Sequence, residues 1–177
     1  MNDSYTWGTN FRDLFDRCVS RYMKGDDDYD SWFNKDDLSF LKSFGYKPRE
    51  LFDFVEDHCN EDGEEPSKET ALLVAAVRRD YFLVEQKGKP SSKEVAASTL
   101  PAKSAALEGY VWLPRIIAKA EAKLHGELDS DTMFGCGGDR AFLSEHDIHP
   151  ADFLRVVWAA KGDKKKIVHF VKTKQWQ

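Results

Sequence analysis

The feature that most constrains this chain is an apolar pattern that occurs twice, 102 residues apart. In residues 10–25 apolar side chains recur at the spacing of one helix face, and residues 109–126 repeat that spacing. At the same offset Asp139 corresponds to Asp37, and Pro150 corresponds to Pro48. The paired apolar positions include Phe11 and Leu113, Leu14 and Ile116, Phe15 and Ile117, Cys18 and Ala120, Leu41 and Leu143, and Val55 and Val157. Two copies are too few for an open solenoid, so we expect both copies to contribute to one core.

Residues typical of helix ends bound these patterns. Asn10 and Asn34 suit N-caps, Gly25 suits a helix C-terminus, and Pro48 suits a first helical turn. The longest helix is expected over residues 67–86 and a final one from about Asp163, whereas strand signals are nearly absent. The predicted fold is all-α, a helical bundle built from two pseudo-repeated helical units. The N-terminal unit spans residues 1–88, a connector spans 89–108, and the C-terminal unit spans 109–177, within one compact domain.

Composition limits the cellular setting. Of the 177 residues, 41% are hydrophobic and 32% are charged, and no apolar run approaches the roughly 18 residues of a membrane span. The N-terminus has no basic region leading into an apolar one, so no signal peptide is expected. Cys18, Cys59 and Cys136 form no CxxC pair, so a disulfide framework is not expected. These features predict a cytoplasmic protein without a membrane partner.

The net charge of -5 conceals an asymmetry between the two halves. Residues 1–86 hold 20 acidic and 11 basic side chains, a net of -9, and residues 87–177 hold 11 acidic and 15 basic ones, a net of +4. Opposite charges of this kind can drive self-association, so a homo-oligomer is one hypothesis, and ordinary variation in surface charge is the other. Nucleic acid is not an expected partner, because the protein is acidic and carries no nucleic-acid-binding motif.

The second copy resembles the bacterial family catalogued as domain of unknown function 5069. The resemblance covers roughly residues 100–172 and depends most on Gly109–Arg115 (GYVWLPR) and on the Ala122, Lys123, Leu124 and Gly126 run. Further matching residues are Lys119, Ala120, Cys136, Asp139, Phe142, Leu143, Asp152, Phe153 and Leu154, whereas Glu121 departs from the basic residue expected there. The resemblance implies a helical, bacterial, cytoplasmic protein and implies no activity.

The start of the 109–126 helix is the first candidate site. Trp112, Arg115 and Lys119 lie off the apolar stripe, and Pro114 falls at the first helical position. We expect free backbone N–H groups beside Arg115, which together with the helix dipole and the guanidinium could hold a phosphate or a carboxylate. The alternative is a solvated Arg and Lys, with Trp112 packed on a neighbouring element.

The segment Phe134–Arg140 (FGCGGDR) is the second candidate. Its glycines free the backbone around Cys136, Asp139 can cap the following helix, and a thiol near a helix N-terminus can act as a nucleophile. The alternative is a tight turn with an idle thiol. His146 and His149 suggest a metal site with Cys136 and Asp147, but partners that would complete and orient such a site are not evident, so neither a metal nor a cofactor is predicted.

Two functional hypotheses follow, and the sequence does not decide whether the protein is an enzyme. The leading hypothesis is a non-enzymatic module that binds a protein partner or a small anionic ligand. Its alternative is a small hydrolase or transferase with Cys136 as nucleophile. The predicted ligand-binding residues are Trp112, Arg115, Lys119, Cys136, Asp139 and Arg140.

Overall fold

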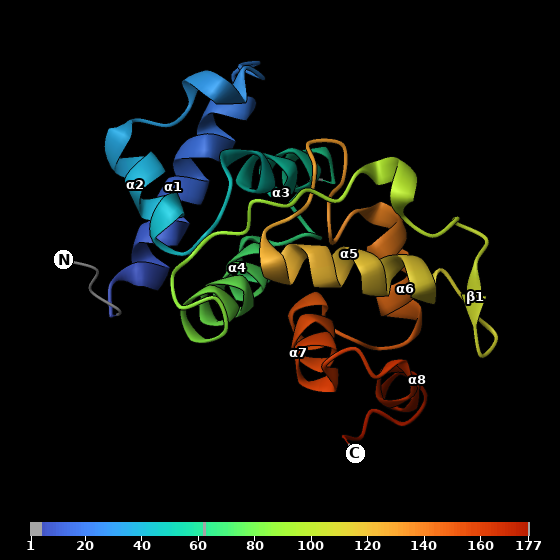
Figure 1. The fold of residues 1–177 in the computed structure, drawn as a ribbon. Helices are drawn as coiled ribbons and strands as arrows, with labels where there is room; N and C mark the ends of the chain where they lie inside the picture. Colours follow the sequence, from blue (N-terminus) through green and yellow to red (C-terminus); the bar gives the residue numbers. More distant parts are fainter. Residues whose placement is uncertain (1–4, 62, 177) are drawn as a thin grey trace. The chain divides into compact units, whose positions relative to one another are not determined.

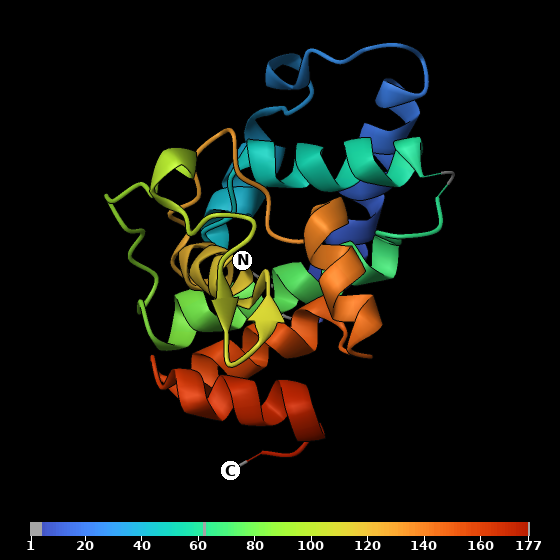
Figure 2. The same ribbon diagram turned by 90° about the vertical axis from the view of Figure 1, so that its right-hand side faces the viewer.

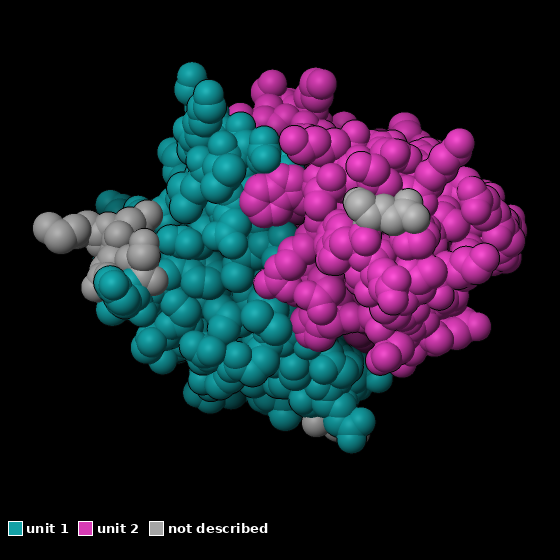
Figure 3. All heavy atoms as spheres, turned by 90° about the horizontal axis from the view of Figure 1, so that it is seen from below, with its two compact units in different colours: residues 1–89 teal, residues 90–177 magenta. Residues whose placement is uncertain are grey.

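The computed structural model describes residues 5–61 and 63–176, and the chain divides into two compact units, one ending at Lys89 and the other beginning at Pro90 (Figure 3). Both units are built mainly from α-helices, eight in all among the described residues (Figure 1). The predicted all-α class is thereby confirmed.

The first unit contains four α-helices and one 3-10 turn. Its elements are α1 (Trp7–Tyr22), η1 (Tyr29–Ser31), α2 (Lys35–Ser43), α3 (Pro48–Asn60) and α4 (Lys68–Val84). Helix α1 packs against α3 and α4. The apolar stripe of α1 is buried as its spacing predicts, at Phe11, Leu14, Phe15 and Cys18.

Helix α1 begins one turn earlier than its expected cap, Asn10. The helix starts at Trp7 and its N-cap is Thr6, whose side chain makes no capping hydrogen bond. The reason lies in the aromatic packing of Trp7, whose ring centroid lies 5.7 Å from that of Phe11 and 5.3 Å from that of Phe44. Tertiary contact therefore outweighs the local capping preference of Asn10.

Helix α2 begins at its predicted cap. The side chain of Asn34 accepts hydrogen bonds from the backbone N–H groups of Asp36 and Asp37. In return the carboxylate of Asp37 accepts the N–H of Asn34, which completes a capping box. Arg17 of α1 forms an ion pair with the same carboxylate at 2.5 Å, so α1 and α2 are joined where α2 starts.

The second unit contains four further α-helices and a short hairpin (Figures 1 and 2). Its elements are η2 (Ala97–Thr99), β1 (Ala106–Leu107), β2 (Tyr110–Val111), α5 (Leu113–His125), α6 (Gly137–Glu145), α7 (Pro150–Ala160) and α8 (Lys164–Thr173). Helix α5 packs on α7, and α7 packs on α8. The predicted stripe of α5 is almost completely buried, at Leu113, Ile116, Ile117, Ala120 and Leu124.

The hairpin that precedes α5 was not expected from the sequence. Strands β1 and β2 pair antiparallel, with Ala106 opposite Val111 and Leu107 opposite Tyr110. The two loop residues, Glu108 and Gly109, both have positive φ angles, of 48° and 88°. Two such residues in a two-residue loop match the twist of the flanking strands, which explains why strands only two residues long still pair.

The helix positions of the two units agree with the predicted offset. Helix α2 spans 35–43 and α6 spans 137–145, so both their starts and their ends lie 102 residues apart, as do the starts of α3 and α7. The ion pair between Arg17 and Asp37 also has a counterpart at the same offset, between Lys119 and Asp139. These agreements support the predicted register; the duplication and the shared core remain predictions.

Candidate functional site at the start of α6

Asp139 is the centre of the candidate site. It is the third residue of α6, and none of its surface is exposed. Its Oδ1 accepts a hydrogen bond from the indole N–H of Trp112 at 2.9 Å. Its Oδ2 accepts from Nζ of Lys119 at 2.5 Å and from the backbone N–H of Gly135 at 2.9 Å. A buried carboxylate needs such donors and an opposite charge, and here α5, the loop and α6 supply them together.

Lys119 lies inside the unit and not on its outer surface. Its side chain extends from the flank of the α5 stripe toward α6 and is only 4% exposed. Besides its ion pair with Asp139, its Nζ donates to Sγ of Cys136 at 3.2 Å. The helical spacing correctly puts this residue off the apolar stripe, but the buried carboxylate draws the ammonium inward. Lys119 therefore links the carboxylate to the thiol.

Trp112 is held in an unusual backbone conformation at the N-cap of α5. Its φ is 74°, in the left-handed region, which costs a bulky L-residue roughly 1–2 kcal/mol. The hydrogen bond to Asp139 and the packing of the ring offset this cost. The ring lies so close to Gly138 that a Cβ there would be 2.5 Å from Cζ2 of the indole. Gly138 is thus required for the start of α6 to approach Trp112.

Arg115 is tied to its own unit at the start of α5. Its Nη1 donates to the carbonyl oxygen of Pro101 at 2.8 Å, and its guanidinium carbon lies 6.0 Å from the centroid of the Trp112 ring. The backbone N–H of Arg115 donates to the carbonyl oxygen of Trp112 at 3.0 Å. The expectation of a free N–H at this residue was therefore wrong, because the carbonyl of the N-cap residue Trp112 closes the first turn of α5.

The start of α6 is more open than the start of α5. Cys136 is the N-cap, and its side chain makes no capping hydrogen bond. Gly137 and Gly138 are exposed, and their backbone N–H groups have no acceptor among the described residues. Because Cys136 is the N-cap, Asp139 lies three residues further on, and its carboxylate accepts a hydrogen bond from the N–H of Gly135 in the preceding loop. Arg140 donates from Nη1 to the carbonyl oxygen of Gly135 at 2.8 Å.

The six residues predicted from the sequence form one connected set of contacts. Trp112, Lys119 and Asp139 interact directly; Cys136 joins through Lys119, and Arg115 through the Trp112 ring. Arg140 joins through Gly135, whose N–H is bound by Asp139. The sequence did not indicate that the Pro101 carbonyl binds Arg115, that Gly135 bonds to Asp139 and Arg140, or that Gly138 contacts the Trp112 ring. The glycine-rich loop signalled the two glycines, whereas nothing local signalled Pro101.

The two histidines of the discounted metal site have helix-end positions. His146 is the C-cap of α6, and its Nδ1 lies 2.8 Å from the carbonyl oxygen of Phe142. His149 is the N-cap of α7, where its Nδ1 accepts the N–H of Ala151. Within residues 5–61 and 63–176, no group of three or more His, Cys, Asp or Glu side chains is placed to hold a metal ion.

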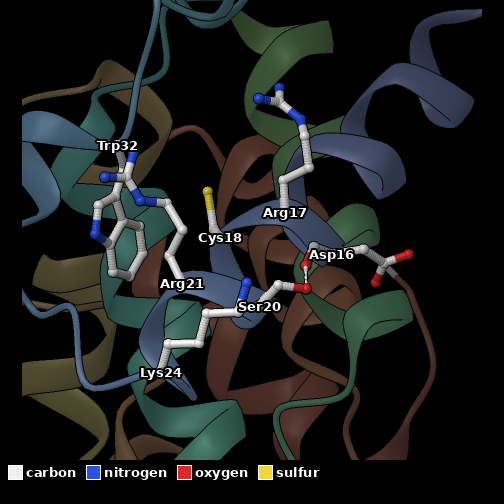
Figure 4. Close-up of a pocket in the computed structure, with 7 residues that line it drawn as sticks. All are labelled: Asp16, Arg17, Cys18, Ser20, Arg21, Lys24 and Trp32. Atoms are coloured by element: carbon white, nitrogen blue, oxygen red, sulfur yellow. Dashed lines mark hydrogen bonds between the residues drawn. The ribbon is translucent and has the colours of Figure 1, made fainter.

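A pocket of about 400 Å³ lies in the first unit, beside α1 (Figure 4). Its lining residues are Asp16, Arg17, Cys18, Ser20, Arg21, Lys24 and Trp32. Both arginines already have acidic partners, since Arg17 pairs with Asp37 and Arg21 with Asp26. Burial, partly opposed by the charge of Arg17, raises the pKa of the Cys18 thiol to about 12, so this thiol is protonated at neutral pH. The pocket thus offers neither a free pair of arginines nor a thiolate.

Comparison with known proteins finds one similarity, to a family of unknown function, over the segment that holds the candidate site. Residues 98–176 match the model of the family described as domain of unknown function (DUF5069). The chain has no match among curated proteins or among solved structures. None of the helices in the described part of the chain combines the length and the apolar character that crossing a membrane requires. The resemblance drawn from GYVWLPR is confirmed: the segment that carries Trp112, Lys119 and Asp139 matches the model of the domain of unknown function 5069 family.

Proposed function

We propose that the C-terminal unit is a non-enzymatic binding module for a small anion, such as a phosphate or a carboxylate. One observation carries the proposal: α6 begins with two exposed glycines whose N–H groups have no acceptor among the described residues. Such N–H groups, at the positive end of a nine-residue helix, are suited to an anion. We therefore propose the start of α6 as the anion site in place of the start of α5, where the N–H of Arg115 is already bonded to the Trp112 carbonyl.

The charges around this helix start favour an anion. Lys119 and Asp139 compensate each other inside the unit, and Asp139 has no exposed surface on which to repel a ligand. The partly exposed Arg115 adds a positive charge on the same side of the unit. A guanidinium provides several donors in a plane, so one bond to a backbone carbonyl leaves further N–H groups for a ligand.

The first unit provides a natural contrast. At the same offset position, Asn34 fills the start of α2 with its own side-chain oxygen and satisfies two N–H groups. Cys136 stands in the corresponding place at α6 and satisfies none. We therefore assign anion binding to the second unit alone.

We further propose that the protein is cytoplasmic and that a protein partner can bind at the same site. All three cysteines are free in the structure, which favours the reducing cytoplasm. A protein partner would use the same site by presenting a carboxylate or a phosphate to it. The opposite net charges of the two halves support self-association as a separate property.

The test is to place a negative charge on the site without disturbing the fold. Gly137→Asp introduces a carboxylate at the first position of α6. There it interacts favourably with the helix dipole but repels an incoming anion. Gly137→Ala is the matched control, because a Cβ there meets nothing closer than Nη2 of Arg140 at 3.9 Å. Thermal unfolding is measured with increasing phosphate, sulfate and malonate at constant ionic strength.

We expect the wild type and Gly137→Ala to be stabilised by at least one of these anions, and Gly137→Asp to lose that response. If the wild type shows no anion-dependent shift, or if Gly137→Asp responds as strongly as the wild type, the proposed site is wrong.

The contact between Lys119 and Cys136 favours covalent catalysis as a second candidate function. An ammonium 3.2 Å from Sγ can donate to a thiolate, which is the nucleophilic form of cysteine. The thiolate would attack an acyl carbon and expel the leaving group with its bonding pair, and water would then hydrolyse the thioester. Turnover of activated esters and thioesters by the wild type, abolished in Cys136→Ser, would support this candidate; equal rates in the two proteins would exclude it.

A further inference from the structure

Cys136 combines access from solvent with a buried amine neighbour. Its side chain is partly exposed at the start of α6, while Nζ of Lys119 is fixed 3.2 Å from Sγ by its ion pair with Asp139. Cys18, by contrast, is only 2% exposed. A small oxidant can therefore reach Cys136, and an amine nitrogen, that of Lys119, lies 3.2 Å from its sulfur.

We propose that Lys119 and Cys136 are a modification site, at which a peroxide joins them covalently through one oxygen atom as Nζ–O–Sγ. This inference does not depend on anion binding or on catalysis, because it needs only the sulfur, the amine and the oxidant. The distance between the two atoms is close to what one bridging oxygen can span after a small movement of the lysine side chain.

The bridge requires two equivalents of peroxide. The thiol, the ammonium and two molecules of hydrogen peroxide give the bridge, three molecules of water and one proton. Sulfur and nitrogen each lose two electrons. The ammonium first gives up the released proton, one S–H bond and one N–H bond of the resulting neutral amine are then replaced by S–O and N–O bonds, and both peroxide O–O bonds break. The first step is the ordinary oxidation of the thiol to a sulfenic acid.

Formation of the bridge removes the charge of Lys119 from the centre of the site. Asp139 would then be a buried carboxylate without a cation, so we assign the released proton to it. The junction between α5 and the start of α6 would change from an ion pair to a covalent link. Oxidation of Cys136 would thus change the charge of Asp139, which also accepts the hydrogen bond from the Trp112 indole.

The experiment uses the full-length chain, reduced and then treated with a small excess of hydrogen peroxide. Intact mass spectrometry should show a gain of about 14 Da, because one oxygen is added and two hydrogens are lost, whereas a sulfenic acid adds about 16 Da. Trypsin should no longer cut after Lys119, and the peptides that contain Lys119 and Cys136 should remain joined. Dithiothreitol should restore the original mass and the cleavage.

Three controls separate the bridge from other oxidation. Cys136→Ser should abolish the gain, and Lys119→Arg should leave Cys136 with only the masses of its sulfur acids. The wild type oxidised in urea should also fail to form the bridge, because the contact exists only in the folded chain; this control does not depend on the folding of any variant. If the folded wild type gives only the sulfur acids on separate peptides, or if the bridge forms equally in urea, the inference is overturned.

Discussion

Replacing Gly138 with alanine tests the packing on which the candidate site is built. A Cβ at this position would lie 2.5 Å from Cζ2 and 2.7 Å from Cη2 of Trp112, distances that force the ring or the helix to move. Overpacking of this kind costs about 1–3 kcal/mol, and replacing glycine with alanine in a helix returns about 1 kcal/mol. We therefore expect a net loss of up to about 2 kcal/mol.

The assay is urea unfolding followed by far-UV circular dichroism. Gly137→Ala is the matched control, because its Cβ has no contact shorter than 3.9 Å and should leave stability unchanged or slightly raised. In a Trp112→Phe background the smaller ring vacates the crowded space, so the cost of Gly138→Ala should fall there. Equal stabilities of the Gly137→Ala and Gly138→Ala proteins, or an undiminished cost in the Trp112→Phe background, would refute the reasoning.

Three further predictions concern buried groups. Because burial raises the Cys18 pKa from 9.0 to about 12, the folded chain keeps a proton that the unfolded chain releases. The contribution of the protonated Cys18 thiol to the free energy of unfolding is therefore complete below about pH 9. Between about pH 9 and 12 this contribution falls by up to about 1.4 kcal/mol per pH unit. Cys18→Ala should flatten this alkaline loss in urea titrations, and an unchanged slope would count against it. Iodoacetamide should modify Cys136 in the native protein much faster than Cys18, as peptide mapping would show; equal rates would contradict the described burial. Lys119→Met should cost about 3–5 kcal/mol in the same unfolding assay, because it leaves the Asp139 carboxylate buried without a cation, and a cost below 1 kcal/mol would contradict that account.

The helices could be predicted from the sequence wherever local chemistry decides them. The apolar stripes marked the buried faces of α1 and α5, and local chemistry also identified the starts of α2 at Asn34, α3 at Pro48 and α4 at Ser67. The early start of α1 could not be predicted, because it depends on contacts of Trp7 with residues that lie far along the chain. The β1–β2 hairpin was not predicted, because strands of two residues are too short to show a periodic pattern in the sequence.

The candidate site was predictable in its members and not in its arrangement. Spacing and local motifs identified Trp112, Lys119, Cys136 and Asp139, and these residues are in contact in the structure, whereas their role in binding a ligand stays a prediction. Which helix start is open depends on the backbone bond from Arg115 to Trp112 and on the Pro101 carbonyl that receives the Arg115 side chain, and neither has a sequence signature. The inward position of Lys119 likewise follows from a carboxylate 20 residues away.

From the bonding of Asp139 we expect its position to accept no other amino acid. Each carboxylate oxygen faces donors, the indole N–H on one side and the Lys119 ammonium with the Gly135 N–H on the other. Asparagine in either orientation would set its NH₂ group against a donor, and glutamate would need room for a methylene where no surface is exposed. A saturation mutagenesis library selected for folded protein should therefore retain aspartate alone at this codon, so that one carboxylate dictates how two helices of the unit may evolve.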